Sequence, residues 1–222
     1  LKIIILLNFL LIFLKVLLEI LKKKIAKKYG ILYIDSGSLY RFVTYISLSK
    51  NIKIESDLDF LYSIDYLNDG TIIYDNHHYG DEELGCDAVN NDVSVIAQIG
   101  AVRLAINKWI RHKSQNTSVV MDGRDIGTVV LPFADVKVFL LSSIDYRMKQ
   151  WQKLQLNRYG HIDIEEEEKE KLKLINRDFH DLHRAVAPLK CAEDATVFNV
   201  EEIELGDIYS FVCAKIDSIL KS

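Results

Sequence analysis

The chain has 222 residues, of which 49% are apolar and 27% are charged, and its net charge is −4. This balance is typical of one globular domain with a full core, and the slight negative charge excludes a broad basic face for nucleic acid. The three cysteines are far apart in the sequence and form no CxxC pair, which argues against a disulfide framework and a zinc site and favours a reducing, cytoplasmic setting.

The first 21 residues are almost wholly apolar, interrupted only by Lys2, Asn8, Lys15 and Glu19. A run of about 20 apolar residues can span a membrane, although charges within it are costly. A signal peptide would be followed by a small-residue cleavage site, whereas five lysines between positions 22 and 28 follow here. A third possibility is that this segment replaces a different structure.

Short apolar runs alternate with helical patterns along the rest of the chain. Strands are predicted at 31–34, 118–121, 136–141 and 195–200, and helices at 93–112, 145–156 and 166–186. This alternation predicts an α/β fold with a mainly parallel sheet covered on both faces. Ligands of such sheets bind beyond the carboxyl ends of the strands, which is where Asp35, Asp122 and Ser142 fall. Residues 51–91, rich in Asn, Asp, Gly and Tyr, predict a hairpin and short strands inserted into this body.

The segment Asp35–Arg41 directly follows a predicted strand. Asp35 and Ser36 can cap a helix whose N–H groups face an anion, and Arg41, one turn later, can bind a phosphate with its planar guanidinium group. Taken alone, this pattern is more often a helix cap with a surface arginine.

Two further clusters lie in the middle of the chain. Ser94 and Arg103 are nine positions apart on one predicted helix and share a face only approximately. In residues 121–128, the end of a predicted strand is followed by two aspartates, Asp122 and Asp125, an arginine, Arg124, and two glycines. Glycine allows the backbone to approach a ligand, so this stretch suits a binding loop better than a surface loop.

A fourth cluster, Arg177, Asp181 and Arg184, has i, i+4, i+7 spacing. Residues Ile175, Phe179, Leu182 and Val186 follow the same rhythm on the opposite side, which predicts that the helix buries this apolar face. The polar face is either a surface ladder of ion pairs, each contributing a few tenths of a kcal/mol, or a pair of arginines directed at phosphates.

In this order and spacing, the four clusters resemble those of bacterial cytidylate kinases. The family pattern D-[ST]-G-[SA]-x-Y-R matches residues 35–41, and D-G-R-D-x-G-T matches residues 122–128. The pattern R-D-x-x-D-x-x-R-x-x-x-P-L matches residues 177–189. The family also has a serine followed later by V-R, which match Ser94 and Val102-Arg103. The resemblance covers roughly residues 25 to 220.

The resemblance implies a three-layer P-loop kinase fold in a single domain, with a parallel central sheet, a CMP-binding insertion at about 42–100 and a helical lid at about 147–165. It implies transfer of the γ-phosphoryl group of ATP to CMP or dCMP, with Mg²⁺ accompanying ATP and no metal held directly by the protein. A monomer without nucleic-acid or membrane partners is expected.

The resemblance also implies a role for each matched residue. The residues expected to hold cytosine and sugar are Ser36, Ser94, Arg103, Arg124 and Asp125. Arg41 would bind the CMP phosphate, and Asp122 would lie near the magnesium shell. Arg177 and Arg184 would neutralise the transferring group, and Asp181 would orient CMP and these arginines. Arg147 and Lys15 would bind ATP.

The sequence departs from the family at its ATP side. The phosphate loop needs G-x-x-x-x-G-K-[ST], but no glycine precedes Gly30. In the lid, Gln150 and Trp151 stand where paired arginines are usual, and residues 84–86 lack a further arginine of the insertion. Residues 1–21 are therefore expected to be aberrant and to replace the first strand and the phosphate loop of the family. One hypothesis is that residues from about 6 to 21 are a frame-shifted reading of the loop, since Lys15 stands where its lysine belongs.

Three alternative functions are consistent with these features. The first is a cytidylate kinase, and the second is a CMP-binding pseudokinase that keeps the acceptor site without phosphoryl transfer. A membrane-anchored protein that uses residues 1–21 as its span is the third reading.

Overall fold

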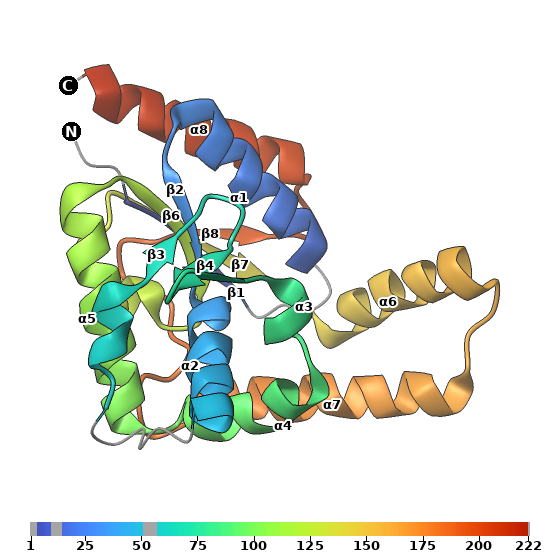
Figure 1. Ribbon diagram of the computed structural model, residues 1–222. Coiled ribbons are helices and arrows are strands. Elements are labelled where there is room, and N and C mark those ends of the chain that lie inside the picture. Colours follow the sequence, from blue (N-terminus) through green and yellow to red (C-terminus); the bar gives the residue numbers. More distant parts are fainter. Residues whose placement is uncertain (1–3, 10–14, 51–56, 222) are drawn as a thin grey trace.

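The computed structural model describes the backbone of residues 4–9, 15–50 and 57–221, and the side chains of these ranges from residue 21 onward (Figure 1). The strands are β1 (Ile4–Phe9), β2 (Leu32–Asp35), β3 (Asp65–Tyr66), β4 (Ile72–Tyr74), β5 (His77–Tyr79), β6 (Val119–Gly123), β7 (Val136–Leu141) and β8 (Thr196–Asn199). The α-helices are α1 (Lys15–Tyr29), α2 (Ser36–Lys50), α3 (Asp81–Leu84), α4 (Asp87–Ile96), α5 (Gly100–Asn116), α6 (Ile144–Tyr159), α7 (Ile164–His183) and α8 (Leu205–Lys221). Short helical turns η1 (Asp59–Ser63) and η2 (Ile126–Val130) complete the described elements.

Five parallel strands form the central sheet in the order β2-β6-β1-β7-β8. The predicted α/β fold is therefore confirmed, and the four strands predicted from apolar runs are β2, β6, β7 and β8. Asp35 and Asp122 are register partners on β2 and β6, and Ser142 directly follows β7. The carboxyl ends of these strands thus meet at one edge of the sheet, as expected.

Two hydrophobic clusters cover the two faces of the sheet. Alternate residues of β6 point to opposite faces: Val119 and Met121 belong to one cluster, and Val120 belongs to the other. The first cluster is completed by α2, α5 and the inserted segment, and the second by α1 and α8. Figure 1 shows α1 and α8 side by side on their face of the sheet. The result is the three-layer arrangement of a P-loop kinase fold.

The N-terminal segment supplies the central strand. Ile4–Phe9 pairs with both β6 and β7, and α1 begins at Lys15. Residues 10–14, part of the segment in which the phosphate loop is expected, are outside the described residues, as is the side chain of Lys15. Among the helices that the structure describes, no single one is long and apolar enough to cross a membrane. Only when taken together do α4 and α5 reach the length and apolar composition of a membrane span, and the chain bends by 95° between them.

A small antiparallel sheet lies in the inserted segment, as predicted. Strands β3, β4 and β5 form it in chain order. The turn between β4 and β5 consists of Asp75 and Asn76, both with positive φ, and short polar side chains tolerate this conformation better than others. The insertion places Tyr66 of β3 against the main body, where its ring lies 5.9 Å from that of Trp109 on α5.

The single helix predicted at 93–112 is wrong, because two helices occur there. Helix α4 ends at Ile96 and α5 starts at Gly100, with Ile99 in an extended conformation between them. Both Ile96 and Ile99 pack against the core, and this burial bends the chain. Glycine is a poor helix former, so continuation of the helix through Gly100 is weakly favoured.

The prediction that α7 buries an apolar face is also wrong. Ile175, Phe179 and Leu182 are 38%, 59% and 44% exposed, and Val186, 58% exposed, lies beyond the end of the helix. Figure 1 shows the cause: α6 and α7 form a helical hairpin that extends away from the sheet. Helix α7 therefore packs mainly on α6, through Leu174, and its other apolar side chains face solvent.

Candidate functional site

The loop from β2 to α2 forms the first part of the candidate site. The Asp35 carboxylate accepts a hydrogen bond from Gly37 N at 2.8 Å and forms an ion pair with Arg41 at 3.4 Å. The Ser38 hydroxyl donates to the Asp35 carbonyl at 2.7 Å. These bonds fix the first turn of α2, and they place the partly exposed Arg41 guanidinium at the carboxyl end of β2.

The loop is tied to the insertion by Tyr66. The Tyr66 hydroxyl accepts a hydrogen bond from Asp35 N at 3.0 Å and lies 2.9 Å from the Ser38 hydroxyl. Burial, together with the nearby charge of Asp35, raises the pKa of Tyr66. The phenol is therefore neutral over the physiological range and can both donate and accept at this point.

Asp122, at the carboxyl end of β6, pairs with a lysine of α1. Lys22 Nζ lies 2.7 Å from Asp122 Oδ1, and the Lys22 side chain is only 1% exposed. Burial raises the pKa of Asp122, while the Lys22 charge opposes this shift. The Ser36 hydroxyl donates to the Asp122 carbonyl at 3.0 Å, which joins the loop after β2 to the end of β6.

The glycine that follows Asp122 is required by packing. A Cβ on Gly123 would lie 2.6 Å from Ile126 Cγ1 and 3.1 Å from the Ser36 hydroxyl. Any larger residue would therefore push the start of η2 away from β6. The sequence predicts that this glycine allows close approach of a ligand, whereas its close neighbours in the structure are the protein's own Ile126 and Ser36.

Asp125 joins two of the predicted arginines. Its Oδ2 lies 2.5 Å from Arg103 Nη2, and its Oδ1 lies 3.4 Å from Arg184 Nη2. The Arg103 guanidinium also lies over the ring of Tyr40, 6.0 Å from its centre. Residues from α2, α5, the loop before η2 and the end of α7 thus meet around one buried carboxylate.

A second ion pair joins the residue that follows β6 to α7. Arg124 Nε donates to Asp181 Oδ2 at 2.7 Å, and both side chains are more than four-fifths buried. Arg177 lies one turn before Asp181. Its pKa is lowered by loss of hydration and by the charges of Arg124 and Arg41. The charges of Arg41, on α2, and Arg124, which follows β6, therefore both act on Arg177 of α7.

Arg147 is directed into the hairpin. Its guanidinium group binds both carboxylate oxygens of Asp178 on α7 and donates to the Ser143 carbonyl, and its side chain is 1% exposed. Trp151 is 4% exposed and packs with Met148 and Leu174 in the small core between α6 and α7. In this arrangement, Arg147 and Trp151 hold the two helices together.

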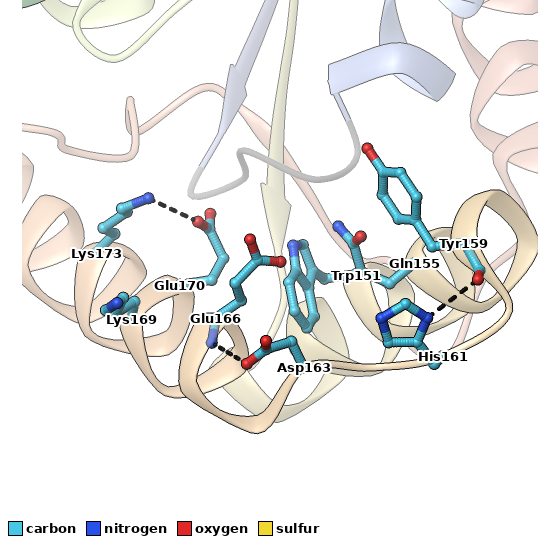
Figure 2. Close-up of a pocket in the computed structure, with 9 residues that line it drawn as sticks. All are labelled: Trp151, Gln155, Tyr159, His161, Asp163, Glu166, Lys169, Glu170 and Lys173. Carbon is cyan, nitrogen blue, oxygen red and sulfur yellow. Dashed lines mark hydrogen bonds and ion pairs between the residues drawn. The ribbon is translucent and has the colours of Figure 1, made fainter.

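A cavity of about 680 Å³ opens farther along the same hairpin. Figure 2 shows Trp151, Gln155 and Tyr159 of α6 on one side of it, and Glu166 and Glu170 of α7 on the other. None of the residues predicted from the sequence motifs lines this cavity. It is therefore separate from the cluster of arginines and aspartates at the sheet edge.

Three of the predicted residues are not brought into this cluster by any described contact: Ser94, Lys15 and Arg147, which binds Asp178 in the hairpin. Ser94 is exposed on α4, and the contact seen there is between its backbone carbonyl and the Gln98 side chain, at 3.0 Å. Because α4 and α5 are separate helices, Ser94 and Arg103 do not share a helix face. For Lys15, the structure describes only the backbone.

Three contributing residues were missed by the sequence argument. Asp178 lay unremarked inside the motif that begins at Arg177, and Tyr66 gave no local signal because its partners are about 30 positions away. Lys22 did leave a signal: it shares a helix face with Leu21, Ile25 and Ala26, all of which are buried. A lysine on an apolar helix face needs a buried anionic partner or a route to solvent.

The cluster can bind an anion at several points. Arginine has five N–H donors, so a guanidinium group that already binds one carboxylate still has donors for phosphate oxygens. The carboxylates of Asp35, Asp125 and Asp181 hold the guanidinium groups in place against their mutual repulsion. Such an arrangement suits a ligand with one or more phosphate groups.

Comparisons with known proteins point to one family. The family model described as cytidylate kinase matches residues 20–218. A cytidylate kinase of Streptococcus uberis is 34% identical over 209 residues, covering 89% of this chain and 90% of its own. That of Streptococcus gordonii is 32% identical with the same coverage, and that of Anoxybacillus flavithermus is 34% identical over 196 residues, covering 84% of each.

Proposed function

Because this chain belongs to the cytidylate kinase family, we propose that it transfers the γ-phosphoryl group of ATP to CMP or dCMP. The observation that carries the proposal is a set of ion pairs at the carboxyl ends of β2 and β6, in which Arg41 pairs with Asp35, Arg124 pairs with Asp181, and Arg103 and Arg184 both pair with Asp125. Three elements distant in the sequence bring positive charge to the place where ligands of parallel sheets bind.

The acceptor nucleotide is proposed to lie between the β2–α2 loop and η2. Arg41, at the start of α2, would bind the CMP phosphate. Arg103 and Asp125, held together in a buried ion pair, would bind the sugar, and Arg124 would face the base. Ser36 lies in this region, where its hydroxyl donates to the Asp122 carbonyl. Ser94 lies on α4, so it would reach CMP only if the inserted segment moved toward the nucleotide.

Phosphoryl transfer is proposed to depend on Arg177, Arg184 and Asp181. An oxygen of the CMP phosphate attacks the γ-phosphorus, the bond to the β-phosphate oxygen breaks, and ADP leaves. Negative charge on the transferring group is stabilised by positioned guanidinium groups rather than by a general base. Asp181 would hold Arg124 and orient the arginines, and Arg184 is already anchored by Asp125 and by the Ala187 carbonyl.

The acidic residues that the structure describes do not fit a magnesium ion bound by protein carboxylates. Asp122, the residue expected nearest to magnesium, is paired with Lys22, and Asp35 is paired with Arg41. Magnesium would therefore have to arrive with the ATP phosphates. Arg147, expected to bind ATP, would first have to leave Asp178.

A second candidate function is CMP binding without phosphoryl transfer. It is favoured by the absence of a G-x-x-x-x-G-K-[ST] loop from the sequence and by the engagement of Asp122 and Arg147 in internal ion pairs. The two candidates share the acceptor site and differ only at the ATP side.

The experiment that tests the proposal measures ADP formation from ATP with CMP, dCMP and UMP, together with CMP binding by calorimetry. Turnover with CMP or dCMP is the expected result, and CMP binding without turnover would support the second candidate instead. Absence of both would overturn the acceptor site.

The variant Arg177→Ala should lower kcat about 100-fold with little change in the Kd for CMP, because Arg177 is proposed to act on the transferring group. The matched control is Arg158→Ala, an exposed arginine at the far end of α6. Equal losses in both variants would contradict the role given to Arg177.

A further inference from the structure

A buried lysine lies beside two neighbouring carboxylates at the edge of the sheet. Lys22 projects from α1, and its Nζ atom lies 5.0 Å from the centre of the Tyr33 ring and 2.7 Å from Asp122 Oδ1. Asp122 and Asp35 are register partners on adjacent parallel strands, which lie about 4.8 Å apart. The charge of Asp35 also raises the pKa of Asp122, so the two carboxylates interact.

The alternation of the strands explains why Lys22 reaches this point. Tyr33 and Val120 are register partners and face α1 and α8. Asp35 and Asp122 come two residues later on their strands, so their side chains leave the sheet on the same face, toward α1. Lys22 follows Leu21 on the buried side of α1, so its long side chain runs along β2 to the carboxyl end of β6.

Each of the two carboxylates has a cationic partner among the described residues. Asp122 pairs with Lys22, and Asp35 pairs with Arg41. A divalent cation at the two carboxylates would have to displace an ammonium group that is 1% exposed, leaving a buried charge without its partner. Breaking a buried ion pair by removal of one partner is strongly destabilising.

We infer that the Lys22 ammonium group is a built-in cation that takes the place of a divalent metal ion at the Asp35–Asp122 pair. The chain therefore excludes divalent cations from these carboxylates, and removal of the lysine charge opens a cation site formed by Asp35 and Asp122. If the chain catalyses phosphoryl transfer as proposed, Lys22 supplies a positive charge at Asp122 that does not depend on magnesium. This consequence rests on the proposed function.

The test measures Mn²⁺ binding to the free protein by electron paramagnetic resonance, with no nucleotide present. Lys22→Met should bind Mn²⁺ at least about tenfold more tightly than the wild-type chain, which corresponds to about 1.4 kcal/mol. Adding Asp122→Asn to this variant should abolish the gain. The matched control is Lys24→Met, which removes an exposed lysine from the same helix and should leave Mn²⁺ affinity unchanged.

Equal Mn²⁺ affinity of the folded Lys22→Met variant and the wild-type chain would overturn the inference. A second measurement needs no change at Lys22: wild-type protein that binds Mn²⁺ tightly, and loses this binding in Asp35→Asn, would overturn it too. Both readouts are independent of CMP phosphorylation, so failure of the inference is distinguishable from failure of the proposed function.

Discussion

The Tyr66 hydroxyl positions the loop that carries Arg41, although Tyr66 belongs to the inserted segment. Tyr66→Phe removes the acceptor for Asp35 N and the partner of the Ser38 hydroxyl. We expect a loss of about 1 kcal/mol in the free energy of unfolding, since buried polar groups lose a hydrogen bond. We also expect weaker CMP binding, because the loop is less well held.

Urea denaturation and calorimetry measure the two effects of this substitution. Tyr62→Phe is the control, since Tyr62 is 55% exposed in the same insertion. Unchanged stability and CMP affinity in Tyr66→Phe would show that the loop is held by Asp35, Gly37 and Arg41 alone.

Asp194 gives the molecule a pH-dependent contribution to stability. The hydrogen bond from buried Lys137 holds the pKa of Asp194 below its usual value. A carboxyl group whose pKa is lowered by folding contributes stability above its unfolded pKa of about 3.9, and this is lost as pH falls through the folded pKa. Because Asp194 itself is largely exposed, we expect only about 1 kcal/mol.

The variant Asp194→Asn should therefore be less stable than wild type at neutral pH and equally stable in strong acid. Denaturant unfolding across this pH range measures the difference, with Glu193→Gln as the exposed neighbouring control. A destabilisation that persists unchanged in acid would contradict the ionic origin of the effect.

At the scale of single residues, the sequence motifs predicted most of the members of the arginine and aspartate cluster but not their partners. The strand ends and motif spacing place Arg41, Arg124 and Asp125 at one sheet edge. The pairing of Arg124 with Asp181, or of Arg103 with Asp125, spans 57 and 22 positions and depends on three-dimensional packing. Side-chain pairing over such distances leaves no local periodicity in the sequence.

At the scale of elements, the α6–α7 hairpin is held by the Arg147–Asp178 ion pair and by a small core of Met148, Trp151 and Leu174. Arg147→Met leaves Asp178 without its cation. We expect amide exchange in α6 and α7 to become about 100-fold faster, which corresponds to roughly 3 kcal/mol, while the sheet keeps its protection.

Hydrogen exchange read by mass spectrometry separates the hairpin from the sheet. Lys149→Met, an exposed residue on the same helix, is the control. Exchange that accelerates equally in the sheet and in the hairpin would contradict the view that the hairpin opens as a separate unit.

The elements whose sequence prediction failed share one physical feature. A helical period in α7 predicts an apolar face, but it does not say whether another element covers that face, and the hairpin extends into solvent. Likewise, the apolar positions of 93–112 suit one helix or two, and the burial of Ile96 and Ile99 decides the bend. Periodicity identifies a face, whereas tertiary packing decides its burial.

At the scale of the whole molecule, the parallel sheet was predictable because buried strands read as continuous apolar runs followed by polar residues. The central position of β1 was not, since its apolar segment also suited a membrane span. The strand order brings β2 and β6 together, and through them the Asp35–Arg41 loop and the 122–128 loop. The proposed acceptor site therefore depends on the topology as much as on the motifs.

The most direct test of this account is a calorimetric titration of the wild-type chain and of Arg41→Ala with CMP. We expect one CMP bound per chain, with affinity at least about tenfold weaker in the variant, because a charge-assisted contact to phosphate contributes about 1.5–3 kcal/mol. Absence of CMP binding, or equal affinity in Arg41→Ala, would contradict an acceptor site at the carboxyl ends of β2 and β6.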